Sequence, residues 1–353
     1  MSMKKKSTRS APARATRPQQ TQQPQPQPQA AQAASSLDGA ETPVILHTPV
    51  MLAEILELFD MLGRPNALVA DCTLGAGGHA EAILSRSSDV RYVGIDADPE
   101  ARERSAARLR PFADRLEIRA GYFDEVLEAW ASFSGFERPD FILFDLGVST
   151  HHYLDSRRGF SFANEEPLDM RFSPEAETSA FDLVNKMTES DLADVIYQYG
   201  EERYSRRIAK SILEARRNAP IRTSKALASI VAGAVPSSYR YGRIHPATRT
   251  FQALRIKVNN ELEREEKGLA SAVEMLAPGG ILAVISFHSL EDRIAKKLCK
   301  DYGKNKGYEE IYKKPRIPTD AECATNPASR SAKLRALRAP SALAASVTKG
   351  ARE

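Results

Sequence analysis

The sequence predicts an α/β protein in which helices cover both faces of a mostly parallel, doubly wound sheet, with a helical domain inserted into it. Short apolar strand segments alternate with amphipathic helical segments after the N-terminal stretch, as in successive β-α-β units. The alternation then stops for roughly 130 residues of mainly helical sequence before another apolar strand begins. No single crossover needs so many residues, so we expect a helical insertion between the fourth and fifth strands.

The elements follow in order from a helix at residues 49–59, where apolar residues recur at helical spacing. Four strands come next, and the last of them is apolar on both faces, as expected of a buried parallel strand. Pro99 stands in the first turn of one intervening helix, where its missing N–H costs nothing. The strands are expected at residues 67–73, 91–97, 115–123 and 140–147, and the helices between them at 79–86, 99–112 and 123–133.

The inserted segment has helical patterns of its own. Thr188 and Asp191 fit a capping box for a helix that stops at Gly200. Further helices are expected at residues 201–217 and 224–235, and as one long or two abutting helices at 247–276, before a fifth strand at 280–287. Ser289, with Asp292 three residues later, is expected to cap the helix after that strand.

The two ends of the chain are basic, although the net charge is only +4. Residues 1–36 hold six basic residues, no acidic residue and a Gln-Pro-rich run, so we expect a disordered tail at residues 1–40. Residues 293–353 hold 15 basic and 6 acidic residues. Such ends favour an anionic polymer as partner, but a solubilising tail, an organelle transit peptide or a solvated face would fit the same charges.

Bulk composition narrows the class of protein. The chain is 42% hydrophobic, which suits a globular core, and no apolar run approaches the roughly 20 residues that span a bilayer. Cys72, Cys299 and Cys323 lie far apart and lack metal-ligand spacing, which favours a reducing compartment over a disulfide framework. We therefore expect a cytoplasmic protein with no membrane partner.

A glycine-rich loop, within DCTLGAGGHAEAIL at residues 71–84, joins the first strand to a helix. Glycines let a ligand approach the backbone and helix amides face it, which predicts a nucleotide-like site in a Rossmann-like sheet. Gly75-x-Gly77-x-x-Ala80 satisfies the dinucleotide fingerprint, and an acid, Asp96, lies 21 residues beyond Gly75. A nicotinamide-dependent oxidoreductase is therefore one interpretation.

Three acids at expected strand ends favour a cationic nucleoside instead. Asp71 directly precedes the loop, where a carboxylate would oppose a doubly negative pyrophosphate. Asp96 ends the second strand and can accept from both ribose hydroxyls, and Asp145 ends the fourth strand. Together they describe a pocket for S-adenosylmethionine, which carries a sulfonium and an ammonium group, although each acid taken alone could be a loop or capping aspartate.

Motifs in a fixed order resemble the bacterial MraW family, the ribosomal RNA small subunit methyltransferases H. They span residues 44–338 and include DCTLGAGGHAEAIL, GIDADPEA, FDLGVST, RGFSFANEEPLDMRF and PGGILAVISFHSLEDR. The resemblance implies an S-adenosylmethionine-dependent methyltransferase with a class I sheet. We expect this domain at residues 44–160 and 245–338, an inserted helical RNA-recognition domain at 161–244, and a flexible C-terminal tail at 339–353.

The resemblance also implies a reaction, a substrate and a set of contacts. The reaction is methyl transfer to the exocyclic N4 of a cytidine in the decoding centre of 16S ribosomal RNA, within the small subunit and without a metal. Phe123 could stack on adenine or pack in the core, and His152 stands where glutamine is common in the family. The implied cofactor contacts are Gly77, Gly78, His79, Asp96, Phe123, Asp145 and His152.

Asp145 is the candidate catalytic residue. A carboxylate that accepts a hydrogen bond from an exocyclic amine makes that nitrogen a better nucleophile, although Asp145 could serve only to orient the cofactor. For the RNA we expect aromatic stacking and phosphate contacts. The candidates are Tyr241, Arg243, Arg249 and His288. A methyltransferase for another nucleic acid or for protein, and a non-catalytic ribosome-associated factor, stay open, as does a homodimer.

Overall fold

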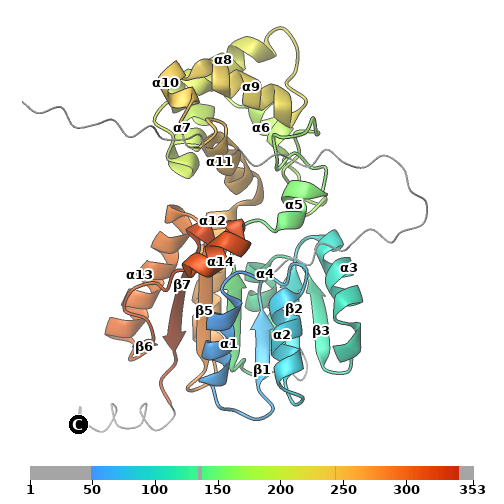
Figure 1. Cartoon of the computed structure of the whole chain (residues 1–353), viewed down its shortest axis with the longest axis vertical. Helices are drawn as coiled ribbons and strands as arrows, with labels where there is room; N and C mark the ends of the chain where they lie inside the picture. Colours follow the sequence, from blue (N-terminus) through green and yellow to red (C-terminus); the bar gives the residue numbers. More distant parts are fainter. Residues whose placement is uncertain (1–48, 134–136, 243, 342–353) are drawn as a thin grey trace, which may run out of the picture. The chain divides into compact units, whose positions relative to one another are not determined.

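The computed structural model describes residues 49–133, 137–242 and 244–341 (Figure 1). Its seven strands are β1 Leu68–Asp71, β2 Arg91–Asp96, β3 Leu116–Ala120, β4 Phe141–Asp145, β5 Ile281–Ser286, β6 Glu309–Glu310 and β7 Lys333–Arg338. They form one sheet in the order β3-β2-β1-β4-β5-β7-β6. The strands from β3 to β5 run parallel, and β7 pairs antiparallel with both β5 and β6. The predicted α/β class is confirmed.

Helices cover both faces of this sheet. Because side chains alternate along a strand, Val69 and Leu143 belong to one apolar cluster with α1 and α2, while Ala70 and Ile142 belong to another with α4, α12 and α13. The helices that flank the sheet are α1 Leu52–Asp60, α2 Gly78–Arg86, α3 Pro99–Arg108, α4 Phe123–Glu128, α12 Glu261–Met275 and α13 Ser289–Asn305 (Figure 1). Short 3-10 turns lie at Arg110–Phe112, Trp130–Ser132 and Pro327–Ser331.

The segment between β4 and β5 is helical, as predicted. Its helices are α5 Thr150–Leu154, α6 Ala180–Lys186, α7 Glu189–Gly200, α8 Ser205–Arg216, α9 Ser224–Ala234, α10 Ser237–Arg240 and α11 Thr248–Asn259. Thr188 caps α7 by accepting from the Asp191 backbone N–H at 3.2 Å, and the helix ends at Gly200, as expected. A Cβ at Gly200 would lie 2.4 Å from the Arg249 carbonyl oxygen, so glycine there allows α7 to pack closely on α11.

Two helices, α11 and α12, occupy residues 247–276, where the sequence predicted either one long helix or two abutting helices. Asn260 separates them in a left-handed conformation with φ 50°. Phe251 and Leu254 of α11 belong to the apolar cluster of the inserted helices, whereas Leu269 of α12 belongs to a cluster of the sheet. The domain boundary near residue 245 stays a prediction, and this packing groups α11 with the insert.

Some expected boundaries were wrong. His288, and not Ser289, caps α13, because its Nδ1 accepts from the Glu291 backbone N–H at 3.3 Å. The Glu291 carboxylate in turn accepts from the His288 N–H, which completes the capping box. The helix expected from residue 201 begins only at Ser205, since Glu201 has a left-handed backbone.

Several elements lie outside the five predicted strands and their helices. β7 carries three basic residues in six, and its Arg335 is buried against Asp292 at 2.7 Å, so its sequence lacks an apolar strand pattern. The short helix α14 Asp320–Thr325 also was not predicted. The tail expected at residues 1–40 and most of that expected at 339–353 lie outside the described residues. Among the helices described, none combines the length and apolar character needed to cross a bilayer.

Candidate functional site

The ends of three neighbouring strands bring the predicted acids to one edge of the sheet. β2, β1 and β4 are adjacent and parallel, so Asp96, Asp71 and Asp145 all lie at the same, carboxyl-terminal edge. In open α/β sheets, ligands bind at this edge. The glycine loop after β1 lies at the same place, because the Gly75 backbone N–H donates to Asp96 Oδ2 at 2.8 Å.

The glycines of this loop have different roles. Gly75 and Gly77 have φ values of 52° and 76°, which favour glycine. A Cβ at Gly75 would have no neighbour nearer than 3.8 Å, whereas one at Gly77 would lie 3.0 Å from Leu109 and one at Gly78 only 2.5 Å from Pro49. The loop is therefore open at Gly75, while the expected cofactor residues Gly77 and Gly78 are also required for packing within the protein.

Asp96 links the second strand to the loop. Its Oδ2 accepts from Gly75 and its Oδ1 accepts from the Asp98 backbone N–H, each at 2.8 Å. Burial raises the pKa of Asp96 to about 6. Each carboxylate oxygen accepts more than one hydrogen bond, so these contacts are compatible with the predicted contact to ribose hydroxyls.

Asp71 is buried, and its partners lie within the protein. Oδ2 accepts from the Tyr92 hydroxyl at 2.8 Å, and Oδ1 accepts from the Thr73 backbone N–H at 3.1 Å. Burial raises the pKa of Asp71 to about 6 despite both hydrogen bonds. The sequence predicts a cationic ligand for this acid, but its contacts in the structure fix the start of the glycine loop.

Asp145 differs from both of these acids. Its Oδ1 is buried and has no hydrogen-bond partner among the described residues, while its Oδ2 lies 3.8 Å from His79 Nδ1. The Asp145 backbone N–H donates to Thr73 Oγ1 at 2.6 Å, which fixes the strand end. Burial, together with the charges of Asp71 and Glu291, raises the pKa of Asp145 well above its ordinary value. A buried carboxyl oxygen without a partner is costly and is suited to a donor that arrives with a ligand.

His79 stands in the first turn of α2, beside this carboxyl group. Its side chain is buried, and its Nε2 lies 3.0 Å from the Val50 carbonyl oxygen, which can only accept. In the neutral ring Nε2 therefore carries the proton. Nδ1 is then unprotonated, and it is the ring nitrogen that faces Asp145. Of the expected cofactor residues, His79 and Asp145 are brought together directly.

His152 lies in a buried ionic cluster instead of an open pocket. Its Nε2 is 2.9 Å from Asp98 Oδ2 and its Nδ1 is 2.9 Å from Ser149 Oγ, so both ring nitrogens have partners. Burial lowers the pKa of His152, so the ring is neutral and donates to the carboxylate. Although burial opposes it, hydrogen bonds from His152 and Arg158 lower the pKa of Asp98 to about 2. The cofactor contact expected of His152 stays a prediction.

Phe123 also packs within the protein. Its ring meets Phe144 edge to face, with the centroids 5.3 Å apart. A Cβ at Gly268 of α12 would lie 2.5 Å from the same ring, so that glycine makes room for it. These contacts favour the core interpretation of Phe123, and stacking on adenine stays a prediction.

The predicted RNA residues differ in exposure. Tyr241 is 84% exposed, whereas Arg249 donates from Nη1 to the Glu201 carbonyl oxygen at 3.0 Å. His288 caps α13, and Arg243 lies outside the described residues. Tyr241 is therefore the candidate whose side chain is most available to a partner.

Three functional residues escaped the sequence analysis. Thr73 holds the Asp145 backbone, Asp98 holds His152, and Glu291 lies buried behind the β4 end. The sequence could have identified Asp98 as a helix cap, because it directly precedes Pro99. In the structure it caps α3 by accepting from the Glu100 N–H at 3.1 Å. Thr73 and Glu291 had no such signal, since only the fold brings them to Asp145.

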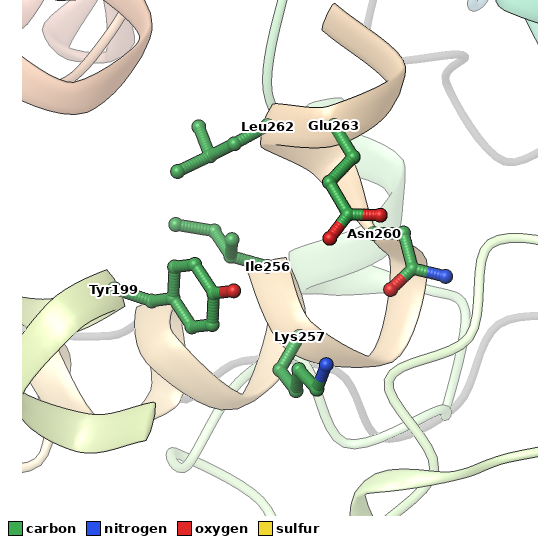
Figure 2. Close-up of a pocket in the computed structure, with 6 residues that line it drawn as sticks. All are labelled: Tyr199, Ile256, Lys257, Asn260, Leu262 and Glu263. Carbon is green, nitrogen blue, oxygen red and sulfur yellow. The ribbon is translucent and has the colours of Figure 1, made fainter. Parts of the chain in front are cut away.

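A surface pocket lies away from the strand ends. It is lined by residues of α7, α11 and α12 and the Asn260 between them, and Figure 2 shows the ring of Tyr199 beside Ile256. The lining residues are Tyr199, Ile256, Lys257, Asn260, Leu262 and Glu263. Since none of them comes from the glycine loop or the strand ends, we assign the pocket no part in the site.

The model of the family described as "MraW methylase family" matches residues 44–339. The chain belongs to the MraW methylase family. A protein of Treponema denticola called "Ribosomal RNA small subunit methyltransferase H" is 46% identical over 83% of this chain and 97% of its own length. A protein of Persephonella marina with the same description is 44% identical over 83% of this chain and 98% of its own length.

Among solved structures, one described as a putative rRNA-methylase from Clostridium thermocellum aligns with a TM-score of 0.41 and 11% identity. It covers 84% of this chain and 99% of its own. The sheet described above is that of a Rossmann-like class I methyltransferase, and S-adenosylmethionine is the cofactor of this MraW methylase. This membership replaces the nicotinamide interpretation of the glycine loop.

Proposed function

We propose that this methylase transfers a methyl group from S-adenosylmethionine to the exocyclic N4 of a cytidine in the decoding centre of 16S ribosomal RNA. The substrate class follows the descriptions of the relatives, which name the small-subunit ribosomal RNA. The observation that carries the chemistry is the buried, unpartnered Oδ1 of Asp145 at the end of β4. An amino group can donate to that oxygen.

The residues of the site suit such a cofactor. The loop is open at Gly75, helix α2 presents its N-terminus beside it, and the Asp96 carboxylate lies within hydrogen-bond reach of Gly75. We assign the cofactor contacts to Gly77, Gly78, His79, Asp96 and Asp145. Phe123 and His152 pack within the protein near these residues, and their own contacts with the cofactor stay predictions. When bound, S-adenosylmethionine supplies an electrophilic methyl group.

The role of Asp145 is to hold the amine. A cytosine amino group is a weak nucleophile because its lone pair is delocalised into the ring. Accepting a hydrogen bond from it at Oδ1 favours a more tetrahedral nitrogen, and the Asp145 carboxylate then takes the proton that the nitrogen loses on methylation. A general base of this kind typically contributes about 10²- to 10⁴-fold in rate. Thr73 keeps the carboxyl group in place through the Asp145 backbone.

The RNA has to present an unstacked base to this edge of the sheet. Unstacking costs a few kcal/mol, and an exposed aromatic ring can offset part of it. Tyr241, in the insert, has the exposure for such a contact, and Arg243 and Arg249 have the charge for phosphate contacts. His288 was also expected in this set, but because its side chain caps α13 and is 13% exposed, we do not assign it to the RNA.

The test is methyl transfer from radiolabelled S-adenosylmethionine to 30S subunits, naked 16S RNA and DNA, with nucleoside analysis of the product. We expect N4-methylcytidine in ribosomal RNA and no label in DNA. Label in DNA or protein alone, or a methylated nucleoside other than N4-methylcytidine, would contradict the proposal. Comparison of 30S subunits with naked RNA identifies which of them is the substrate.

A further inference from the structure

A buried group of side chains lies where α12 begins and where β5 passes into α13. Glu261, His288 and Glu291 each present one ligating atom, and these atoms all lie within 4.8 Å of one another. Their side chains are 12%, 13% and 3% exposed. Imidazole and carboxylate groups gathered this closely are the ligands of a metal ion, but they need a further sign that a cation belongs there.

Glu265 supplies that sign. It lies one turn after Glu261 on α12, so the two carboxylates share a face of the helix. Glu265 is 1% exposed, and neither of its carboxylate oxygens has a hydrogen-bond partner among the described residues. The charges that act most on it are those of Glu291 and Glu261, both negative. Burying a carboxyl group beside two others, without a donor, is unfavourable unless a cation or a proton joins it.

The positive charge described around this group is smaller than its negative charge. Arg255 binds Glu261 through two contacts, Nε to Oε1 and Nη2 to Oε2, each at 2.8 Å. Glu291 Oε2 accepts from the backbone N–H groups of Phe287 and His288, and His288 Nε2 lies 3.1 Å from Glu291 Oε1 without a hydrogen bond. Among the contacts given for the described residues, these three carboxylates share one guanidinium, so a divalent ion would neutralise the negative charge that it leaves.

We propose that Glu261, His288 and Glu291 bind a divalent transition-metal ion, whose charge the buried carboxyl group of Glu265 also calls for. One imidazole with carboxylates suits Zn²⁺ or Mn²⁺ better than Ca²⁺ or Mg²⁺, which prefer oxygen ligands alone. The resemblance implied a reaction without a metal, and no ligand spacing pointed to these residues, because they are spread over two separate segments of the sequence.

The ion's role is structural. It ties α12, which follows directly on the inserted helix α11, to the start of α13 beyond β5. It also lies behind the loop after β4, since a Cβ at Gly147 would be 3.9 Å from Glu291 Oε1. The ion thus fixes the support beneath the Asp145 loop, and it takes no part in methyl transfer.

The test uses the full chain without an affinity tag, stripped with a chelator and then given MnCl₂ or ZnSO₄. Bound metal is counted by mass spectrometry, Mn²⁺ is followed by electron paramagnetic resonance, and thermal unfolding is recorded with and without each ion. We expect one ion per chain and a higher Tm with metal. Glu265→Gln should lose both effects, whereas Glu266→Gln, at an exposed position one residue further on, should keep them.

A second variant guards against misfolding of the first. His288→Asn removes the imidazole but keeps a side chain that can cap α13, and it should also lose the bound ion. Equal metal content in wild type, Glu265→Gln and His288→Asn would overturn the proposal. So would a wild type that binds neither ion, because Glu265 would then simply be protonated.

Discussion

The ends of β2 and β4 carry carboxyl groups in opposite situations. Beyond β2, Asp96 and Asp98 have their oxygens occupied by backbone N–H groups, His152 and Arg158. At the end of β4, the Asp145 side chain is 22% exposed, but its Oδ1 atom is buried and has no hydrogen-bond partner among the described residues. The two sites belong to one sheet edge, so the difference lies in their partners and not in their position.

This difference distinguishes carboxyl groups that hold the protein's structure from the one that we propose acts in methyl transfer. A buried carboxylate that also pairs with a guanidinium can have a low pKa, as Asp98 does beside Arg158 with a pKa of about 2, whereas burial outweighs the two backbone donors of Asp96 and raises its pKa to about 6. A carboxyl group that is buried without donors has a raised pKa and gains from a ligand that donates to it, as we propose for Asp145. The following predictions test this division, beginning with the largest expected effect.

Arg158→Ala should strongly destabilise the fold. Asp98 is 1% exposed, and without the guanidinium its charge would have only two neutral donors, the His152 ring and the Glu100 backbone N–H, among the contacts described. Leaving a buried charge short of its partner typically costs about 3 kcal/mol or more. Urea unfolding of the variant measures this cost, and Arg157→Gln, at an exposed neighbouring position, is the control. A loss no larger than that of the control would show that the β2 end does not depend on this pair.

Asp71→Asn should change how stability depends on pH. Burial raises the folded-state pKa of Asp71 from 3.8 to about 6, so folding favours its protonated form. Its contribution is fully present below about pH 4 and is lost as pH rises through about 6. The free energy of unfolding of wild type, relative to Asp71→Asn, should therefore fall by about 3 kcal/mol across that window.

The measurement is denaturant unfolding of wild type and Asp71→Asn from pH 4 to pH 7.5. Asp114→Asn, at an exposed position, should show no such difference from wild type. A difference between wild type and Asp71→Asn that grows with pH in the opposite direction would mean that Asp71 is stabilised as a carboxylate, like Asp98.

Two glycine substitutions test the loop between these strand ends. Gly78→Ala should cost about 1–3 kcal/mol, because its Cβ would lie 2.5 Å from Pro49 Cγ and force repacking. Gly75→Ala has open space, so only its φ of 52° is unfavourable, at about 1–2 kcal/mol. Thermal unfolding measures both losses. A loss for Gly78→Ala within about 0.5 kcal/mol, as at an ordinary surface position, would contradict the packing role of Gly78.

Tyr241→Ala should leave stability within about 0.5 kcal/mol of wild type, since the side chain is 84% exposed. If the ring stacks on a base, RNA binding should weaken by about 1–3 kcal/mol. Titration of labelled 16S RNA fragments measures the affinity, with Tyr197→Ala, at a tyrosine that is 62% exposed, as the matched control. Equal affinities for both variants and wild type would remove Tyr241 from the RNA surface.

The sequence predicted the sheet well where each strand had its own apolar run. β1, β2 and β4 were found, and with them the meeting of Asp71, Asp96 and Asp145 at one edge. β7 was missed because its pairing with β5, and not its composition, makes it a strand. Sequence patterns reveal only local periodicity. β7 is a basic segment that begins 47 residues after the end of β5, and it has no such periodicity.

The candidate site was predicted less completely than the fold. Asp145 could be chosen because it ends a strand, but its missing partner could not, since that depends on every neighbour at once. His152 and Phe123 were named from the resemblance, and the structure places both in packed surroundings with partners of their own. The charge imbalance at Glu265 arises from α12 and α13 together, so neither segment alone reveals it.

The most direct test of this account compares Asp145→Ala with wild type in single-turnover methyl transfer to small ribosomal subunits, at S-adenosylmethionine concentrations that saturate each protein. Alanine removes both carboxyl oxygens, whereas the amide oxygen of an asparagine could still accept from the amine. We predict a fall of about 100-fold or more in the rate at saturating cofactor, beyond any loss of cofactor affinity measured by calorimetry. A normal rate in Asp145→Ala, or a loss of rate that saturating cofactor restores, would contradict the role of Asp145 in holding the amine.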